Sequence, residues 1–578
     1  MSKLLYVNHR FKELGESETP ILQAICDALV PDNVTRSPHH HIRVNGRSAY
    51  AVTPTAANLG ESGMSVRLGS LFGTHGKTWS VPRSPSPDGS FAIIRADDEH
   101  LELVSDATAS RTLWYYHDKE IFLASTSQIA LVMYLGRFDF DAQVIPWMLS
   151  TGTLGPNASW DAKLQRVPAD STLLLEKHRW TLSMQRNTFT LAVERAPEVD
   201  HRARLSEAIA KTMQSLQPDD MRDWVLPLSG GYDSRAVLCF MGESARTAPG
   251  FKAVTWGLAE SLGDPANDAR IASDLAKAMG VEHEYRLTDA SGEPADLIVN
   301  RFLQCGEGRI DHLAAYADGM RIWRDFHDTG VRGIVRGDEA FGSEEVSSEL
   351  TLKMHISFAT CADYANLDHV IDAFDLPPQE VPAELARGAG ESLEAWRDRL
   401  FVQYRLPTGF AALSDVKNAY VESINPLLSK GILDVVRVLP DDLRTEKRLF
   451  RQVVRDVSPA IPFASRRAIA FSEDILKTPA FVAFMRAELQ SDRARQALGS
   501  ALIDFVLAGL EERGALNDSA RRRLAILRRV KSRLPRAAKN WFRDRAIRPR
   551  VDPYVLAFRV VMIHRMRDLL ASRARVAH

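Results

Sequence analysis

A strand, a glycine loop and a helix follow one another in residues 224–240, WVLPLSGGYDSRAVLCF. The apolar beginning of this stretch predicts a buried strand, and the spacing of apolar residues from Asp233 onward predicts a helix. The same alternation recurs with a strand at 251–257 and a helix at 267–280. Alternating strands and helices predict a parallel sheet, with ligand-binding loops at the carboxyl ends of its strands.

The first 190 residues have a different pattern. They contain short runs rich in aromatic and β-branched residues, separated by polar turns, which predict a β-rich domain. The clearest runs lie at 90–96, 101–106, 112–118 and 120–127. After about residue 345 the chain is mainly of helical pattern.

The chain has 578 residues, of which 45% are hydrophobic, so it can form two or three domains with sizeable cores. No apolar run is long enough to predict a membrane span, and the N-terminus has no signal-peptide pattern. Four cysteines lie far apart, at positions 26, 239, 305 and 361. This spacing favours a reducing cytoplasm and disfavours a zinc or iron–sulfur site.

Positive charge is concentrated near the C-terminus. Residues 520–550 hold thirteen Lys or Arg against one Asp, although the net charge of the chain is −1. Such a run is usual for nucleic-acid-binding proteins, but a pair of basic helices that docks on the acidic remainder explains it equally simply. The chain has no closely spaced cysteine pairs and no aromatic-interleaved RNA motif. Their absence favours a pair of basic helices over a nucleic-acid-binding segment, so neither DNA nor RNA is an expected partner.

The glycine loop can bind phosphate. Backbone amides of Ser229, Gly230 and Gly231, just before a helix, would form a concave surface of donors for phosphate oxygens. Asp233 follows where a carboxylate could hold Mg²⁺ beside a pyrophosphate, and Ser234 adds a hydroxyl. The alternative is an ordinary glycine turn between strand and helix. The G-x-x-x-x-G-K-[ST] spacing of a Walker loop is absent.

The loop resembles the SGGxDS pyrophosphate loop of the ATP-pyrophosphatase superfamily, which forms acyl-adenylates. A second acidic segment, GIVRGDEAFGSEE at 333–345, resembles the GxDExFGG segment of the asparagine-synthetase family, where an aspartate completes the Mg²⁺ site; Asp338 takes that place. Segments 421–440 and 446–454 resemble later parts of that family and place Glu422 and Lys447 near the site, unless these two residues form a buried ion pair. The resemblance assigns nucleotide binding to Leu228, Ser229, Gly230, Gly231, Asp233, Ser234, Trp256, Gly257 and Gly337.

The resemblance also implies the fold and the domains. We expect α/β plus α+β architecture: an N-terminal Ntn-glutaminase-like β-rich sandwich domain over 1–195, and a C-terminal parallel-sheet ATP-pyrophosphatase (asparagine-synthetase-like) domain with added helices over 200–520. Residues 521–578 would form a basic helical extension packed on the synthetase domain. Residues 87–132 match the family's glutaminase run, yet Ser2 stands where the family has its cysteine nucleophile. The expected N-terminal domain is therefore a glutaminase scaffold without glutaminase chemistry.

An adenylating domain beside an inactive glutaminase domain occurs in relatives that use an amine other than ammonia. SGGYDSR, RGDEAFG, STSQ and WMLSTGTLGPNASWD look like lasso-peptide macrolactam synthetases. One departure concerns a lysine that stabilises the transition state in asparagine and β-lactam synthetases. Ala468 takes its place here, which leaves Arg466, Arg467 or Lys447 to supply the positive charge.

The expected activity is ATP- and Mg²⁺-dependent closure of a macrolactam in a leader-processed precursor peptide. A leader peptidase and a leader-binding protein are the implied partners. Asp233, Asp338, Glu422, Lys447 and Arg466 are the expected catalytic residues, and Asp233 and Asp338 are the expected metal ligands. The alternatives are a small-molecule amide synthetase of asparagine or β-lactam type and a nucleic-acid-modifying ATP pyrophosphatase.

Overall fold

The computed structural model describes residues 3–36, 38–53, 58–73, 78–367, 370–468, 472–514 and 549–575. Ser2 and most of the basic run at 520–550 lie outside these ranges, so the expectations about them stay untested. None of the helices in these ranges is both long enough and apolar enough to cross a membrane.

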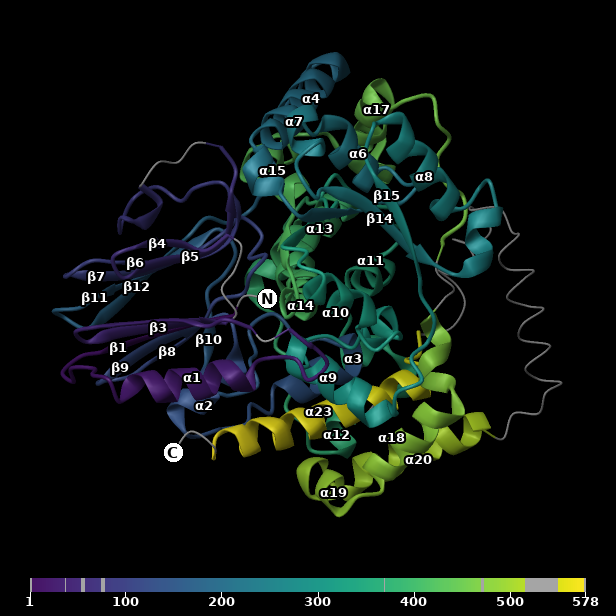
Figure 1. Cartoon of the computed structure of the whole chain (residues 1–578). Helices are drawn as coiled ribbons and strands as arrows, with labels where there is room; N and C mark the ends of the chain where they lie inside the picture. Colours follow the sequence, from purple (N-terminus) through teal and green to yellow (C-terminus); the bar gives the residue numbers. More distant parts are fainter. Residues whose placement is uncertain are drawn as a thin grey trace.

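Two antiparallel sheets, each of six strands within the described residues, form the N-terminal part of the molecule (Figure 1). The strand orders are β10-β8-β9-β1-β3-β2 and β12-β11-β7-β6-β5-β4. The strands are β1 (Lys3–His9), β2 (His41–Asn45), β3 (Ser48–Thr53), β4 (Gly60–Ser62), β5 (Ser65–Leu71), β6 (Gly89–Ala96), β7 (His100–Ser105), β8 (Trp114–His117), β9 (Ile121–Ser125), β10 (Gln165–Arg166), β11 (Ser171–Glu176) and β12 (Thr181–Arg186). The strands expected at 90–127 are thereby confirmed.

The two sheets pack face to face, and alternate residues of a strand point to opposite faces of its sheet. Tyr6 and Val52 from one sheet meet Val66, Ile94 and Leu103 from the other in a single buried cluster. Helices α1 (Glu18–Ala28) and α2 (Gln128–Leu135) cover the outer face of the sheet that contains β1. This part of the chain is a β-sandwich with helices on one side.

A parallel sheet of five described strands lies at the centre of the second part, in the order β15-β14-β13-β16-β17. Its strands are β13 (Trp224–Pro227), β14 (Lys252–Gly257), β15 (His283–Leu287), β16 (Gly333–Val335) and β17 (Glu422–Ile424). The alternation of strands and helices in the sequence predicts this sheet, and the structure confirms it. The carboxyl ends of β13, β14 and β16 lie side by side.

Helices cover the parallel sheet and fill most of the chain after residue 345 (Figure 1). They are α3 (Val144–Thr151), α4 (Glu198–Gln214), α5 (Pro218–Met221), α6 (Asp233–Phe240), α7 (Glu243–Arg246), α8 (Asp268–Ala278), α9 (Ala295–Gly306), α10 (Arg321–Asp328), α11 (Glu349–Ile356), α12 (Val370–Ala373), α13 (Leu393–Leu400), α14 (Ala411–Asn418), α15 (Lys430–Val436), α16 (Asp441–Arg444), α17 (Arg448–Val457), α18 (Pro479–Leu489), α19 (Asp492–Leu498), α20 (Ser500–Gly514) and α23 (Pro553–Arg573). Between α13 and α14 the chain forms a π-helix, η7 (Phe401–Phe410), which contains Pro407.

The C-terminal helix α23, yellow in Figure 1, crosses the lower half of the view and contacts both parts. Its neighbours include α2 and α3, which adjoin the sandwich, and α9, α18 and α20, which belong to the second part. The sequence predicts a helical extension packed on the synthetase domain. The described helix contacts α9, α18 and α20 of the second part, and it also contacts α2 and α3.

Candidate functional site

The backbone amides of the loop after β13 donate hydrogen bonds to side chains of the protein. The Ser229 amide donates to Ser234 Oγ at 3.0 Å, and the Gly231 amide donates to Ser229 Oγ at 3.2 Å. The Gly230 amide donates to Asp268 Oδ1 at 3.0 Å. The three amides that the sequence predicts as phosphate donors therefore already have acceptors within the protein, as buried N–H groups usually do. The first amides of α6, which begins at Asp233, have no acceptor within their own helix and remain suited to phosphate.

Glycine is needed at position 230 because another segment approaches the loop closely. A Cβ there would lie 2.5 Å from Ala464 Cβ and 2.9 Å from Ile271 Cβ. The approaching segment is held by Arg235, whose guanidinium donates to the carbonyls of Ile461 and Pro462 at 2.8 and 2.7 Å. The loop is thus fixed from both sides before any ligand binds.

The second acidic loop follows β16 and packs against the first. A Cβ on Gly337 would lie 2.9 Å from both the Asp233 carbonyl carbon and the Ser234 nitrogen, so only glycine allows this approach. Asp338 Oδ1 accepts a hydrogen bond from Arg336 at 2.9 Å. Asp338 Oδ2 is buried and accepts no hydrogen bond from the described residues. A buried carboxylate oxygen without a donor is costly unless a cation or a ligand contacts it.

Lys447 joins the two acidic loops. Its Nζ lies 3.0 Å from Asp233 Oδ1 and 2.7 Å from Glu339 Oε1. Glu446 and Lys447 both have positive φ, at 60° and 55°, directly before α17. Two successive non-glycine residues in the left-handed region are strained, and such strain is concentrated at functional sites. The Lys447 ammonium group is therefore held between two carboxylates by a strained backbone conformation.

The electrostatics of this cluster follow from burial and from close charges. Burial and the nearby Asp233 carboxylate raise the pKa of Glu339 to about 7, although the Lys447 ammonium opposes the rise. Burial lowers the pKa of Lys447, but the carboxylates of Glu339 and Asp233 outweigh burial and raise it above its usual value. Lys447 is therefore a permanent cation, and Glu339 can change its charge near neutral pH.

Two cavities lie around these loops. One, of about 300 Å³, is lined by Asp233, Glu339 and Lys447 together with Phe401 and Phe410 of η7. The other, of about 230 Å³, is lined by Ser229, Asp233, Ser234, Trp256, Trp323, Gly337, Asp338 and Lys417, among others. The cavities share Asp233, Gly337 and Asp338, so ligands in them would meet at the two carboxylates.

Several predicted nucleotide-binding residues lie next to these cavities. Trp256, at the end of β14, contacts Trp323 edge-on with ring centroids 5.6 Å apart. Gly257 packs beneath the backbone of Ala468, whose carbonyl oxygen would be 2.4 Å from a Cβ at that position. Leu228 is buried and donates its amide to Val254 at 2.9 Å, which aligns β13 with β14. Trp256 lines the 230 Å³ cavity. Leu228 and Gly257 do not line it, and their backbone packing holds the neighbouring strands and the Ala468 segment in place.

Glu422 and Arg466 are not among the described residues that line either cavity. Glu422 lies in β17 with only 1% of its side chain exposed and forms an ion pair with Arg111 of the N-terminal part. Arg466 has 71% of its side chain exposed and pairs with Asp264 at 2.7 Å. The structure therefore does not bring these two predicted catalytic residues together with Asp233, Asp338 and Lys447.

Glu339 and Lys417 line the cavities but were not among the predicted site residues. Glu339 could have been found, since it is the second acid of the same GDEAFG segment. Lys417 lies in α14, and its Nζ contacts Tyr316 OH at 3.1 Å and the Leu413 carbonyl at 2.8 Å. Burial lowers the pKa of Lys417 well below its usual value, and Arg336 lowers it further. No sequence motif marks this lysine.

The donor set fits a magnesium ion that arrives with a nucleotide. Within the described residues, no group of three or more His, Cys, Asp or Glu side chains is arranged to hold a metal alone. Nucleotide-bound Mg²⁺ needs only one or two protein carboxylates, because phosphates and water supply the other oxygens. Asp338, with its unpartnered Oδ2, and Asp233, which lines both cavities, match this requirement.

Two solved structures are similar to the chain, each with a TM-score of 0.20. The allosteric regulatory enzyme of purine biosynthesis is 10% identical and covers 50% of this chain and 81% of its own. Glutamine phosphoribosylpyrophosphate amidotransferase from B. subtilis, in complex with ADP and GMP, is 9% identical and covers 51% of this chain and 83% of its own. The comparison with curated proteins gives no significant match.

The family comparison concerns the segment that contains the glycine loop. The asparagine synthase family matches residues 183–307, which include β13, β14 and β15 and end before Asp338 and Lys447. This match supports an asparagine-synthetase-like, ATP-dependent amide ligase.

Proposed function

We propose that the protein is an AMP-forming peptide cyclase that closes a macrolactam in a lasso peptide. It would adenylate an Asp or Glu side chain of the leader-processed peptide and join it to the peptide's N-terminal amine, in the cytoplasm. The observation that carries the proposal is the convergence of Asp233, Asp338 and Lys447, from three separate segments, on two adjoining cavities. Ligands of α/β proteins bind at the carboxyl ends of parallel strands, so cationic and carboxylate groups at these strand ends support the proposal of a nucleotide site.

In the proposed reaction, a carboxylate oxygen of the peptide attacks the α-phosphorus of ATP, and the bond to the β-phosphate oxygen breaks. Pyrophosphate leaves and an acyl-adenylate remains. The peptide's α-amine then attacks the acyl carbon, loses a proton, and expels AMP as the amide forms. An α-amine has a pKa of about 7.7–8.0, so a useful fraction is neutral near pH 7 without a strong base.

The residues of the chain contribute mainly by orientation and charge. Amides of the first turn of α6 and the Lys447 ammonium would face phosphoryl oxygens that gain negative charge in the transition state. Asp233 and Asp338 would hold Mg²⁺, which neutralises phosphate charge when it is bound. Glu339 keeps the Lys447 ammonium in place through their 2.7 Å contact. Arg466 and Arg467 are exposed and neither lines the two cavities, so Lys447 is the best candidate for the positive charge that the family's lysine supplies.

The N-terminal sandwich would act as a scaffold. We propose that it derives from an Ntn-type glutaminase domain and has lost its chemistry, since Ser2 replaces the nucleophilic cysteine. A leader peptidase and a leader-binding protein would supply the processed peptide. The support for this role is the resemblance of residues 87–132 to the glutaminase run, together with the sandwich that those residues form.

The proposal is tested with purified protein, ATP, Mg²⁺ and the core peptide encoded beside its gene, with the leader removed in the same mixture. We expect one AMP per product molecule and a product lighter than the peptide by one water. Acetylation of the peptide's α-amine should block ring closure while still allowing AMP formation, because activation precedes attack. Asp233→Asn and Asp338→Asn should each abolish AMP release without unfolding the protein.

The small-molecule alternative predicts a different outcome. If the peptide is never dehydrated but ammonia or a small β-amino acid supports amide formation, the enzyme is a synthetase of asparagine or β-lactam type. Release of glutamate from glutamine, proportional to enzyme and lost in Ser2→Ala, would show instead that the N-terminal part is an active glutaminase.

A further inference from the structure

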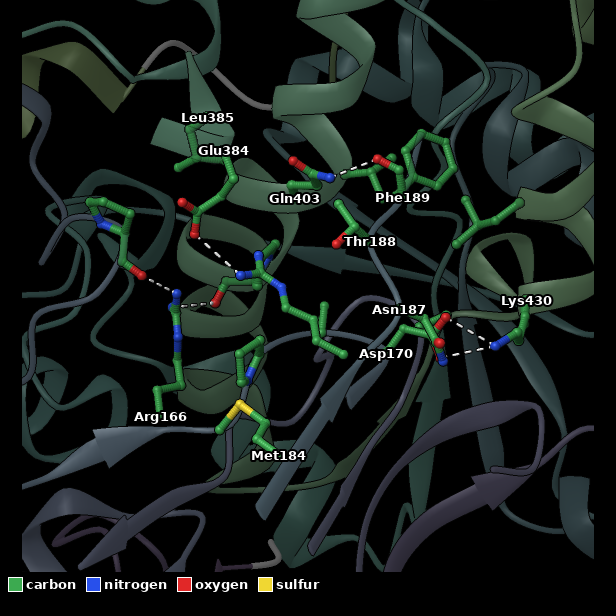
Figure 2. Close-up of a pocket in the computed structure, with 18 of the residues that line it drawn as sticks. Arg166, Asp170, Met184, Asn187, Thr188, Phe189, Glu384, Leu385, Gln403 and Lys430 are labelled. Atoms are coloured by element: carbon green, nitrogen blue, oxygen red, sulfur yellow. Dashed lines mark hydrogen bonds and ion pairs between the residues drawn. The ribbon is translucent and has the colours of Figure 1, made fainter. Parts of the chain in front are cut away.

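A third cavity, of about 860 Å³, lies between the sandwich and the helical part (Figure 2). Its walls come from β10, β12 and the chain after β12 on one side, and from η7 and α15 on the other. A volume of this size is typical of sites that hold an organic ligand. None of its described lining residues also lines the two cavities around Asp233, so it is a separate site.

The π-helix η7 separates this cavity from the candidate active site. Val402, Gln403 and Pro407 line the large cavity, whereas Phe401 and Phe410 line the cavity that contains Lys447 and Glu339. Long π-helices are rare, and π-helical turns occur frequently at functional sites. A ligand in the large cavity would therefore lie one helix away from the proposed adenylation chemistry.

The walls of the large cavity carry charges of both signs, and three ion pairs use most of them. Lys430 contacts Asp170 at 2.9 Å, Arg186 contacts Glu384 at 3.2 Å, and Arg437 contacts Asp434 at 3.2 Å. Figure 2 shows Glu384 on one side of the cavity and the Lys430–Asp170 pair on the other.

Arg166 is the remaining charged residue of the wall, and it contacts no carboxylate within the described residues. Its guanidinium donates instead to the backbone carbonyls of Pro156 and Pro407. Burial, together with the nearby positive charges of Arg309 and Arg186, lowers the pKa of Arg166 to about 10. The described wall has four cationic side chains and three carboxylates, so one positive charge has no acidic partner there. A ligand carboxylate at this position would supply the missing negative charge.

The other features of the wall suit a peptide. Met184, Phe189, Leu385, Val402 and Leu433 add apolar surface beside the polar groups. β12 is an edge strand of its sheet within the described residues, and its side chains are largely exposed. The unpaired backbone of an edge strand can pair with an extended chain, as in other peptide-binding proteins.

We propose that this cavity binds an extended segment of the substrate peptide, away from the ring that is being closed, and that Arg166 binds one of its carboxylates. The inference rests on the proposed function for the identity of the substrate. It assigns recognition of the peptide to the junction of the two parts of the molecule, and it gives the sandwich a role in binding.

The test measures peptide binding apart from catalysis. A display library of random linear peptides is selected on the full-length wild-type protein and on two variants, Thr188→Trp and Thr190→Trp. Both threonines are exposed, but only Thr188 lines the cavity. We expect peptides that bind the wild type and Thr190→Trp but not Thr188→Trp. Equal selection on all three proteins, or no selection on the wild type, overturns the proposal.

The role of Arg166 is tested with the selected peptides. Arg166→Gln should weaken their binding roughly 10- to 100-fold, the value of one charged hydrogen bond. Replacing the critical Asp or Glu of the peptide by its amide should weaken binding to the wild type equally but have no further effect on Arg166→Gln. The control Arg179→Gln, at a side chain that is 79% exposed, should bind normally. Additive losses would mean that Arg166 does not bind the carboxylate.

Failure of the inference can be distinguished from failure of the proposed function. If the core peptide is cyclised with an unchanged KM by Thr188→Trp, the function stands and the cavity is not its peptide site. If selected peptides depend on Thr188 and Arg166 but neither they nor the core peptide release AMP from ATP, the binding site stands and the cyclase reaction does not.

Discussion

The predicted site residues fall into two groups, those that line the candidate active site and those that stabilise the fold elsewhere. Asp233 and Asp338 lie where the acidic loops meet, and Lys447 lies between Asp233 and Glu339. Glu422, by contrast, is a buried carboxylate whose ion pair with Arg111 joins β17 to the sandwich. Breaking a buried pair by removing one partner is strongly destabilising, because the other charge stays buried without compensation.

We therefore predict that Glu422→Gln lowers the stability of the protein by about 3–5 kcal/mol, which is typical of a broken buried ion pair. Chemical denaturation monitored by fluorescence measures the change. The double variant Arg111→Met/Glu422→Leu should recover much of the loss, since it leaves no charge unpaired. If Glu422→Gln is as stable as the wild type but releases no AMP, Glu422 is catalytic, as the sequence resemblance implies.

The residues also show what the sequence can and cannot predict. A motif identifies positions that are close in sequence, so the loops with Asp233 and Asp338 were predictable. It does not show where a donor will find its acceptor: Asp268, 38 residues further along, occupies the Gly230 amide. Nor does it show that Lys417, in a helix without a motif, lines the cavity. Such contacts depend on tertiary packing.

At the scale of elements, the local period of apolar residues was sufficient to predict β13, α6, β14 and α8. It did not determine that β16 and β17 complete the sheet, because β17 follows a long helical insertion and has only three residues. It also did not predict η7, since a π-helix containing Pro407 resembles an ordinary interrupted helix in sequence. The loop with Asp338 follows β16, and η7 lines the cavity that contains Lys447. The elements that the sequence did not predict therefore bear on function.

One hydrogen-bonded chain links neighbouring strands to the glycine loop. His283 Nε2 of β15 lies 2.9 Å from Thr255 Oγ1 of β14, and that hydroxyl donates to the Leu228 carbonyl at 2.6 Å. Burial lowers the pKa of His283 below its usual 6.5, while Glu284 opposes the change. The folded protein thus binds a proton at His283 less readily than the unfolded chain does.

The sign of the resulting pH dependence follows from linkage. At acidic pH the unfolded chain binds more protons than the fold, so stability contributed by neutral His283 is lost as pH falls below about 6.5. We predict that His283→Gln reduces the loss in thermal midpoint between about pH 7.5 and pH 5.5. The exposed control His178→Gln should follow the wild type. Parallel curves for His283→Gln and the wild type would contradict this role.

At the scale of the whole molecule, the two parts are held together by more than the chain that connects them. The Arg111–Glu422 pair joins the sandwich to the parallel sheet, and the 860 Å³ cavity opens at the same junction. Below them, α23 contacts helices of both parts, and its Arg559 binds Asp311 at 2.7 Å and the Leu149 carbonyl at 2.8 Å. A peptide bound at the junction would therefore lie between parts that are already fixed relative to one another.

This arrangement predicts that α23 stabilises both parts at once. Phe558 of α23 is fully buried, so Phe558→Ala should lower stability by about 3–5 kcal/mol through lost burial and the cavity it leaves. Ser572→Ala, at an exposed position of the same helix, should change stability by less than about 0.5 kcal/mol. Hydrogen exchange should show that Phe558→Ala loosens α3 and α9 together, because α23 contacts both. If protection is lost only in α9, α18 and α20, the helix stabilises the second part alone, and the sandwich is held by other contacts.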